Sequence, residues 1–396
     1  MERKILHLDL DAFFCAVEEK FDPSLKGKPF ATGGSPEGRG VVSSCSYAAR
    51  QFGIHSAMPM KLALRKYPEL IVVRGHYKDY NKESRKVMDI IRNLTPLVEQ
   101  ISIDEAFLDV SDLPEIPQRI ASDLQMKIFS ELDLPCSIGA ASNKLIAKIA
   151  TNIGKKKNRG KFAPMAITVV ETGREKEFLA PLPVDEMWGI GPKTTAELNE
   201  IGIKTIGNIA SYPRELLIKK IGLFADDLIR RAQGIDNRPV AEYEGIKSIS
   251  NEITFFRDKG NQEELYVTLK QLSEKVGMRL RKKQLSGKTV KIKVRWPDFQ
   301  THSHQLTLSQ PTNQDSVIYE AALHLFNHLW SPGKKVRLIG VGASQLEDEY
   351  YQLELFDRSF QKEKELLKAI DELHEKFGEK SLQKGFTNQS LMNWKD

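Results

Sequence analysis

The sequence predicts an α+β protein built from several domains. Its 396 residues are too many for one ordinary hydrophobic core, so we expect roughly two to four domains of about 100–200 residues each. Strand and helix patterns follow one another as β-α-β-β-α-β near the N-terminus and again over residues 247–344. Between these regions, residues 178–234 contain only short helical segments. These three observations favour two mixed domains separated by a small helical one.

The first region is predicted to form an antiparallel split-βαβ sheet with helices on one face. Short apolar runs predict the strands, and apolar residues three or four positions apart predict the helices. The expected strands are residues 4–10, 41–45, 99–103, 106–110 and 136–141. The expected helices are residues 11–19, 47–52, 61–66, 80–94 and 116–132, and a turn-rich loop is expected at residues 33–40.

The second mixed region follows a linker predicted at residues 238–245. Its expected strands are residues 249–255, 289–296, 302–308 and 336–342, and its expected helices are residues 263–283 and 316–329. An acidic stretch begins at residue 347 and leads into one more helix, whose apolar face is predicted to hold Leu366, Ile370, Leu373 and Phe377.

Several classes of protein are excluded by composition. No apolar run approaches the roughly 20 residues that cross a bilayer, so we expect no membrane contact. Asp9 stands where a signal peptide would need its apolar stretch, which predicts a cytoplasmic protein. Cys15, Cys45 and Cys136 lie far apart, so neither a disulfide scaffold nor a thiolate zinc site is expected.

The net charge of +6 is unevenly distributed. Residues 134–170 carry seven basic side chains and no acidic one, and residues 275–296 carry nine and none. Within the second stretch, Val290, Ile292, Val294 and Trp296 alternate with Thr289, Lys291, Lys293 and Arg295. This period of two predicts a strand with one buried face and one cationic face. An anionic partner such as a nucleic-acid backbone would suit that face; the alternative is an ordinary solvated surface.

Two pairs of carboxylates interrupt apolar segments. Asp9 and Asp11 end the first strand, and Asp104 and Glu105 lie within the expected hairpin. Because neighbours in a strand point to opposite faces, the second pair converges only if the chain bends there. If the two segments lie side by side, their carboxylates form a set of hard oxygen ligands that suits Mg²⁺. The alternative is that each is a solvent-exposed turn acid.

Two further motifs suit phosphate binding. Tyr47 and Arg50 are three residues apart at a helix start and therefore share a face. A glycine-containing turn between short helices, typical of a helix-hairpin-helix, offers backbone N–H groups to a DNA backbone; its candidates are Gly189, Gly191, Lys193 and Thr194. A surface Tyr–Arg pair and a plain tight turn are the respective alternatives.

Taken together, these motifs resemble the Y family of translesion DNA polymerases, most closely its bacterial DNA polymerase IV type. The matching segments are residues 8–14, 44–53, 102–106, 141–150 and 188–191. The resemblance implies a right-hand fold with a split-βαβ palm and an added little finger. The implied domains are a palm at 1–10 and 77–165, fingers at 11–76, a helical thumb at 166–236, a linker at 237–245, a four-stranded little finger at 246–345 and a tail at 346–396.

The resemblance also implies an activity and its site. Asp9 and Asp104 would ligate two Mg²⁺ ions with the Leu10 carbonyl, and Glu105 would be the catalytic acidic residue that completes the metal site. The enzyme would add deoxyribonucleotides to a primer 3′ end by two-metal nucleotidyl transfer, with low fidelity and without a proofreading exonuclease. Its expected role is translesion synthesis in DNA damage tolerance and repair.

Binding residues follow from the same resemblance. Phe14 would be the steric gate that leaves no room for a 2′-hydroxyl. The expected dNTP contacts are Phe13, Phe14, Ser44, Tyr47, Arg50 and Lys155, with Lys156 as the alternative to Lys155. The expected contacts to primer-template DNA are Gly189, Gly191, Lys193, Thr194, Lys291, Lys293 and Arg295. A peptide resembling those that dock on the bacterial sliding clamp comprises Gln352, Leu353, Leu355 and Phe356, the alternative being an edge strand.

Two other functions compete with a monomeric polymerase. A non-catalytic DNA-binding adaptor would have no use for the carboxylates Asp9, Asp104 and Glu105. A palm-type nucleotidyl cyclase would have no use for the helical turn or the cationic strand. The sequence therefore favours the polymerase over both.

Overall fold

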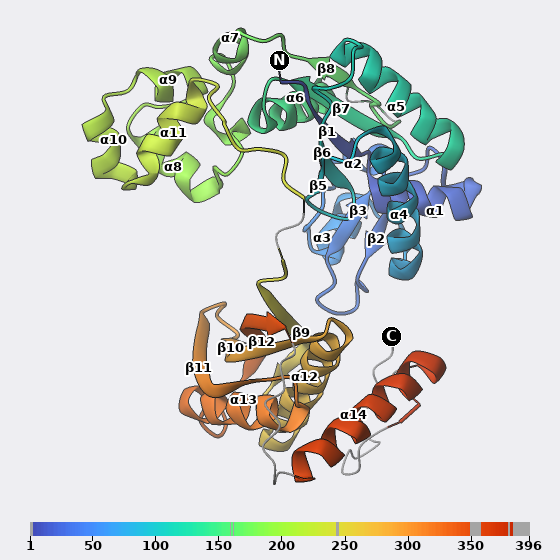
Figure 1. Ribbon diagram of the computed structural model, residues 1–396, viewed down its shortest axis with the longest axis vertical. Coiled ribbons are helices and arrows are strands. Elements are labelled where there is room, and N and C mark those ends of the chain that lie inside the picture. The colour runs from blue at the N-terminus through green and yellow to red at the C-terminus, as the bar shows by residue number, and fades with distance from the viewer. Residues whose placement is uncertain are drawn as a thin grey trace. The chain divides into compact units, whose positions relative to one another are not determined.

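The computed structural model describes residues 3–158, 160, 162–242, 245–348, 358–378 and 381–382. For residues 358–364 it describes the backbone only. The chain divides into two compact units, Met1–Glu244 and Gly245–Asp396, and each is considered by itself (Figure 1). Among the described helices, none combines the length and apolar character that crossing a membrane requires.

The first unit is built on a five-stranded sheet of order β5-β6-β1-β7-β8. Its central strand β1 (Ile5–Leu10) is antiparallel to both neighbours, β6 (Glu105–Asp109) and β7 (Cys136–Ala141). The edges are β5 (Val98–Gln100), paired with β6, and β8 (Ile167–Val169), which runs parallel to β7. The predicted antiparallel core is confirmed, and β8 is an addition to it.

Helices cover both faces of this sheet, so the prediction of helices on one face is wrong. Leu6 and Leu8 pack on the side of α4 (Tyr77–Leu94) and α5 (Pro117–Leu132), as expected. On the opposite face, Ile5 packs with α6 (Lys144–Lys157). The physical reason is that β1 buries nearly every side chain, whichever way it points, so both faces need a cover.

A smaller sheet of order β3-β2-β4 follows β1 in the chain. Its strands are β2 (Phe30–Gly33), β3 (Val42–Cys45) and β4 (Ile71–Val73). Of these strands only β3 was predicted, and all three are too short, at three or four residues, for alternation to show. The helices of this region are α1 (Phe13–Phe21), the 3₁₀ turn η1 (Pro23–Leu25), α2 (Tyr47–Arg50) and α3 (Met60–Lys66).

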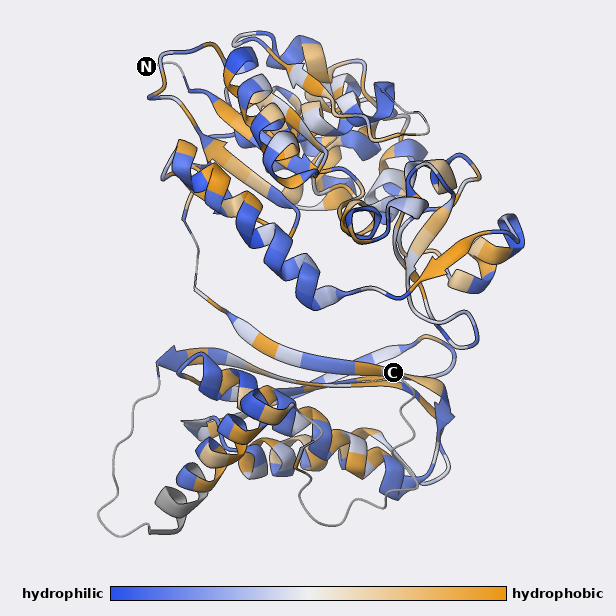
Figure 2. Cartoon of the chain, turned by 90° about the vertical axis from the view of Figure 1, so that its right-hand side faces the viewer, coloured by the Kyte–Doolittle hydropathy of each residue, from blue (hydrophilic) through white to orange (hydrophobic). Residues whose placement is uncertain are grey.

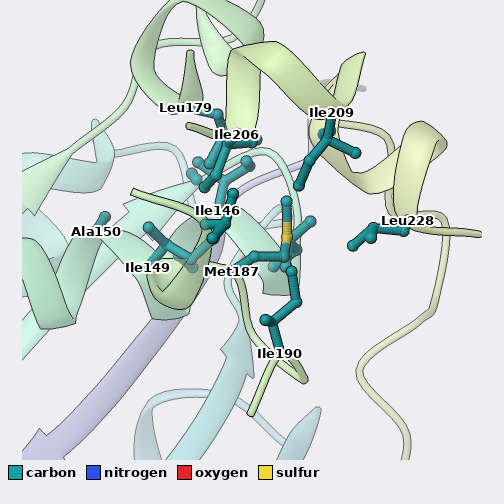
Figure 3. Close-up of a cluster of buried hydrophobic side chains, with 14 of the residues drawn as sticks. Ile146, Ile149, Ala150, Leu179, Met187, Ile190, Ile206, Ile209 and Leu228 are labelled. Atoms are coloured by element: carbon teal, nitrogen blue, oxygen red, sulfur yellow. The ribbon is translucent and has the colours of Figure 1, made fainter. Parts of the chain in front are cut away.

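The predicted all-helical region is confirmed. It contains α7 (Glu175–Leu179), the 3₁₀ turn η2 (Val184–Glu186), α8 (Pro192–Glu200), α9 (Ile206–Ser211), α10 (Arg214–Ile221) and α11 (Phe224–Ala232). Its buried apolar side chains join those of α6 in one core, where Ile146 and Ile149 lie near Met187 and Ile206 (Figure 3). The helix that covers the sheet therefore also anchors the helical region.

The second unit is an antiparallel sheet of order β11-β10-β12-β9. Its strands are β9 (Ser248–Lys259), β10 (Leu285–Arg295), β11 (Thr301–Thr312) and β12 (Val336–Asp348). Helices α12 (Gln262–Lys282) and α13 (Asp315–Leu329) cover one face with their apolar sides (Figure 2). Val290, Ile292 and Val294 lie in that core, as predicted, but Thr289 does not join the cationic face: it is buried and hydrogen-bonded to Thr307 and Gln345.

The predicted C-terminal helix is present as α14 (Arg358–Phe377), docked on the second unit. The Arg281 guanidinium joins Asp371 of α14, at 2.6 Å from Nε and 3.0 Å from Nη2, to Asp315 at 2.8 Å. The predicted apolar face is wrong. Leu366, Leu373 and Phe377 are exposed, and Leu367 is the buried leucine.

Candidate active site

Sheet register brings the predicted carboxylates to one edge. Asp9 of β1 stands opposite Glu105 of β6, and the Leu10 N–H donates to the Asp104 carbonyl at 3.0 Å. A bend before β6 turns the Asp104 side chain, because the Ser102 Oγ donates to the Asp104 Oδ1 at 2.5 Å and accepts the Glu105 N–H at 3.0 Å. This is the bend that the sequence required for convergence.

Two lysines of α6 face these carboxylates. The Lys155 ammonium lies 2.6 Å from Asp9 and 3.0 Å from Asp11, and the Lys148 ammonium lies 2.7 Å from Glu105. Burial raises the pKa of Asp9 to about 6, against the pull of Lys155 and with a contribution from Glu105. Burial would lower the pKa of Lys155, but Asp9 and Asp11 outweigh it and raise that pKa. The site thus concentrates negative charge that a cation stabilises.

Asp11 has a positioning role that the sequence did not reveal. Its carboxylate is almost fully buried and accepts hydrogen bonds from the Ser137 hydroxyl at 3.0 Å and from the Met165 N–H at 3.0 Å. The Tyr47 hydroxyl donates to it at 3.5 Å. Asp11 therefore connects β1, β7 and α2 beneath the site, and its oxygens are already engaged by protein donors.

His7 lies under the same edge. Its ring is fully buried, with Nδ1 2.9 Å from the Thr151 hydroxyl and Nε2 3.4 Å from the Lys148 ammonium. Burial holds the pKa of His7 well below its usual range, and Lys148 and Lys155 add to this. A neutral imidazole can accept a hydrogen bond from Lys148, which keeps that lysine directed at Glu105.

The donor set fits a hard divalent cation. Asp9, Asp104, Glu105 and the Leu10 carbonyl supply only oxygen ligands, which Mg²⁺ prefers. Within the described residues, no group of three or more acidic, His or Cys side chains is gathered closely enough to hold a metal. Lys155 occupies an oxygen of Asp9, so binding a metal there requires this ammonium group to move aside, whereas Lys148 contacts a single oxygen of Glu105.

Tyr47 and Arg50 share a face of α2, as predicted. The Arg50 guanidinium stacks over the Tyr47 ring at 4.5 Å, a cation–π contact, and its Nε donates to the Cys45 carbonyl at 3.4 Å. Both residues line a cleft of about 520 Å³ together with His55 and Gly160. Ser44, on β3, is buried.

Phe14 stacks on Tyr80 of α4, with ring centroids 4.4 Å apart and planes at 12°. Phe13 is buried, and its ring centroid lies 5.7 Å from that of Phe14. The Tyr80 hydroxyl donates to the buried Glu18 carboxylate, which also accepts the His76 N–H at 3.2 Å. The Phe14 ring therefore packs against Tyr80, whose own position is fixed by its hydrogen bond to Glu18.

The predicted helix-hairpin-helix is a 3₁₀ turn followed by α8. Gly189 adopts φ +97°, a conformation that favours glycine, and α8 begins at Pro192 after Gly191. The Lys193 side chain is 89% exposed. Thr194 lies in the first turn of α8, so the turn presents its polar groups to solvent.

Much of the basic charge is engaged within the protein. In the first basic stretch, Lys144 pairs with Glu99 at 2.7 Å, and Lys156 pairs with Glu186, away from the carboxylate edge. On β10, Lys291 is exposed, Lys293 pairs with Glu252 at 2.8 Å, and the Arg295 Nε donates to Thr301 at 2.8 Å. Counting lysines and arginines therefore overstates the charge available to a polyanion. The peptide Gln352, Leu353, Leu355 and Phe356 lies outside the described residues.

Known proteins resemble this chain along most of its length. Residues 8–152 match the impB/mucB/samB family, residues 172–203 the IMS family HHH motif, and residues 246–355 the impB/mucB/samB family C-terminal domain. DNA polymerase IV of Dehalococcoides mccartyi (strain CBDB1) is 40% identical over 389 residues, which is 97% of each chain. DNA polymerase IV of Streptococcus mutans is 40% identical over 352 residues, covering 87% of this chain and 93% of the relative.

The chain belongs to the Y family of DNA polymerases, in its bacterial DNA polymerase IV branch. A solved Y-family polymerase chimera of Dbh and Dpo4 superposes with a TM-score of 0.76 at 25% identity, over 86% of this chain and 98% of that one. An insertion ternary complex of Dbh DNA polymerase gives a TM-score of 0.63 at 25% identity, with the same coverage. The right-hand polymerase fold predicted from the sequence is confirmed.

This Y-family chain is a DNA-directed DNA polymerase that acts in translesion synthesis with low fidelity and without proofreading, and its chemistry depends on metal. The described geometry is consistent with that activity. Its two carboxylate segments meet where β1 ends and β6 begins, and the Tyr47–Arg50 pair is linked to them through Asp11.

Proposed function

We propose that Asp9, Asp104 and Glu105, with the Leu10 carbonyl, hold two Mg²⁺ ions and form the catalytic centre of this polymerase. The observation that carries the proposal is the pairing of Asp9 with Glu105 across β1 and β6, next to the Leu10–Asp104 backbone hydrogen bond. When bound, the ions would lower the pKa of the primer 3′-hydroxyl and neutralise charge on the triphosphate and the leaving pyrophosphate.

The lysines of α6 gain a role from this arrangement. Lys155 contacts both Asp9 and Asp11, and a cation held by Asp9 would free its ammonium from that carboxylate. The ammonium would then be available to the incoming triphosphate, still oriented by Asp11. Lys148 stays between Glu105 and His7 and keeps the Glu105 carboxylate in place. We therefore assign triphosphate binding to Lys155 rather than Lys156, which is paired with Glu186.

The remaining nucleotide contacts lie on α1, β3 and α2. Tyr47 and Arg50 bind the phosphates, since a hydroxyl and a guanidinium at a helix start suit an anion. Ser44 and Phe13 support them from buried positions. Phe14 acts as the steric gate: its ring, braced by Tyr80, is rigid enough for a 2′-hydroxyl to clash with it rather than displace it.

Domain roles follow from the described elements. We assign the palm to residues 1–10 and 77–165, the fingers to 11–76, the thumb to 166–236 and the little finger to 246–345, with a linker at 237–245. The DNA contacts proposed on the thumb are Gly189, Gly191, Lys193 and Thr194, and those on the little finger are Lys291, Lys293 and Arg295. The first group binds phosphate through exposed backbone and side-chain donors, without reading sequence.

We further propose that the polymerase works as a monomer in the cytoplasm. The tail at 346–396 would dock on the sliding clamp through Gln352, Leu353, Leu355 and Phe356. Removing the Leu355 and Phe356 side chains should abolish clamp binding in a pull-down while leaving distributive primer extension unchanged. If clamp binding were unchanged, the clamp-docking role of this peptide would be wrong, and the alternative, that the peptide is an edge strand, would be favoured.

The test of the catalytic assignment is Mg²⁺-dependent extension of a labelled primer on undamaged and abasic templates. Asp104→Ala should lose extension, whereas Asp112→Ala, an exposed carboxylate beyond the far end of β6, should keep it. If both variants extend equally, the assignment of Asp104 is wrong. If the unaltered chain binds DNA but extends under no metal, the adaptor function becomes the better explanation.

A further inference from the structure

A pair of histidines on α13 is not used by the polymerase site. His324 and His328 are four residues apart, so they stand one turn above the other on the same side of the helix. Both side chains are exposed. Their Nε2 atoms face each other at 3.2 Å, and the ring planes cross at 82° with centroids 4.5 Å apart.

We propose that His324 and His328 form a chelating site for a transition metal ion such as Zn²⁺, Ni²⁺ or Cu²⁺. Metal–nitrogen bonds of about 2.0–2.1 Å at a tetrahedral angle place two ligand nitrogens roughly 3.3 Å apart. The observed separation of 3.2 Å matches this value. The two nitrogens are therefore already at the spacing of a shared ion, and ring rotation within the same helix turn would direct both lone pairs at it.

In the absence of metal the same contact is a hydrogen bond between neutral rings. One Nε2–H donates and the other Nε2 accepts. On binding, the donor ring moves its hydrogen from Nε2 to Nδ1, so both Nε2 lone pairs face the ion and no net proton is released. Binding replaces one weak, solvent-exposed hydrogen bond and two water ligands of the ion by two metal–nitrogen bonds, and imidazole nitrogen is a stronger ligand than water for these ions.

The helix that presents the pair is held firmly. Leu325 and Phe326, between the two histidines, are buried in the core of the second unit. Asn327 accepts a hydrogen bond from the Tyr266 hydroxyl of α12 at 2.8 Å. This anchoring fixes the backbone spacing of the pair before metal arrives, which lowers the entropy lost on binding.

The donor set decides which ions the pair would take. Imidazole nitrogen suits Zn²⁺, Ni²⁺ and Cu²⁺, whereas Mg²⁺ prefers oxygen. The described residues offer no third His, Cys or acidic side chain within reach, so the other coordination positions are left to water. The site is therefore open and exchangeable, and chemically distinct from the carboxylate edge of the polymerase.

The test is calorimetric titration of the untagged full chain with NiCl₂ in excess Mg²⁺, which keeps the carboxylate site occupied by its own ion. We expect one Ni²⁺ per chain. His324→Ala and His328→Ala should each weaken binding by roughly a hundredfold, because each removes the intramolecular second bond of the chelate. His374→Ala, at a half-buried histidine on α14, is the control and should leave the titration unchanged.

The proposal fails if Ni²⁺ binding is absent or survives either single substitution. It also fails if His302→Ala on β11 removes the binding, since His302 and His304 would then be the ligands. Primer extension serves as a folding check: it should be the same in all four variants, because none of these histidines belongs to the polymerase site.

Discussion

Gly139 of β7 packs directly against α6, so adding a single carbon there tests how precisely that helix must be placed. A Cβ built there would lie 2.0 Å from the Ala147 carbonyl oxygen and 2.6 Å from the Thr151 N–H nitrogen, both backbone atoms of α6. Real Cβ atoms essentially never approach closer than 3.0 Å, so α6 must move by at least 3.0 − 2.0 = 1.0 Å. Such overpacking against backbone destabilises by about 3 kcal/mol.

The same shift carries Lys148 and Lys155 away from the carboxylates. A displacement of about 1 Å in a positioning element lowers the rate of chemistry by about a hundredfold. We therefore expect Gly139→Ala to lower both the thermal midpoint of the first unit and the single-turnover rate of nucleotide incorporation. Gly245→Ala, where no described atom lies within 4 Å of the added carbon, is the control. Wild-type stability and rate in Gly139→Ala would refute the role given to α6.

Three further predictions follow from the nucleotide pocket. Phe14→Ala should relax the choice of dNTP over rNTP by about a hundredfold or more in competing incorporation, because the clash with the 2′-hydroxyl disappears; unchanged selectivity would place the gate elsewhere. Lys155→Ala should raise the KM for dNTP at least tenfold in steady-state extension, while Lys156→Ala leaves it unchanged; the reverse pattern would reassign the triphosphate contact. Tyr80→Phe should destabilise the fold by about 1–3 kcal/mol in thermal unfolding, because the buried Glu18 loses a donor, and an unaltered midpoint would show that this hydrogen bond contributes nothing.

The carboxylate edge was predictable because each of its two chain segments carries acidic residues in an otherwise apolar stretch. Asp9 ends an apolar strand, and Asp104 and Glu105 interrupt an apolar hairpin, so only adjacency of the two segments had to be assumed. The register of β1 against β6 supplies that adjacency. Convergence of the carboxylates needed a bend, but its position at Ser102, which aims Asp104, could not be located from the sequence.

The network behind the site was not predictable, because its partners are distant in sequence. Asp11 meets Ser137, 126 residues later, and His7 meets Thr151, 144 residues later. No local pattern marks such pairs. The basic stretch that contains Lys155 was interpreted as a surface for a polyanion, whereas the fold directs Lys155 inward to a carboxylate.

The short strands β2 and β4 were not predicted for a different reason. β2 and β4 span four and three residues, too few for a period of two to be seen. They form through pairing, in which β2 lies between β3 and β4 and bonds to both. On α14, apolar spacing alone selected the wrong face. The Arg281–Asp371 ion pair and Leu367 decide which side of that helix meets the second unit.

The central claim, that Asp9, Asp104 and Glu105 hold the catalytic ions, is tested most directly by counting them. Mn²⁺, which gives a paramagnetic signal, can be titrated into the full chain with dNTP and a primer ending in a dideoxynucleotide, so that no turnover occurs. Any Mn²⁺ on the α13 histidines is subtracted using His324→Ala. We expect two tightly bound ions in the unaltered chain and fewer in Asp104→Ala. The same two ions, with equal affinity in that variant, would contradict the claim.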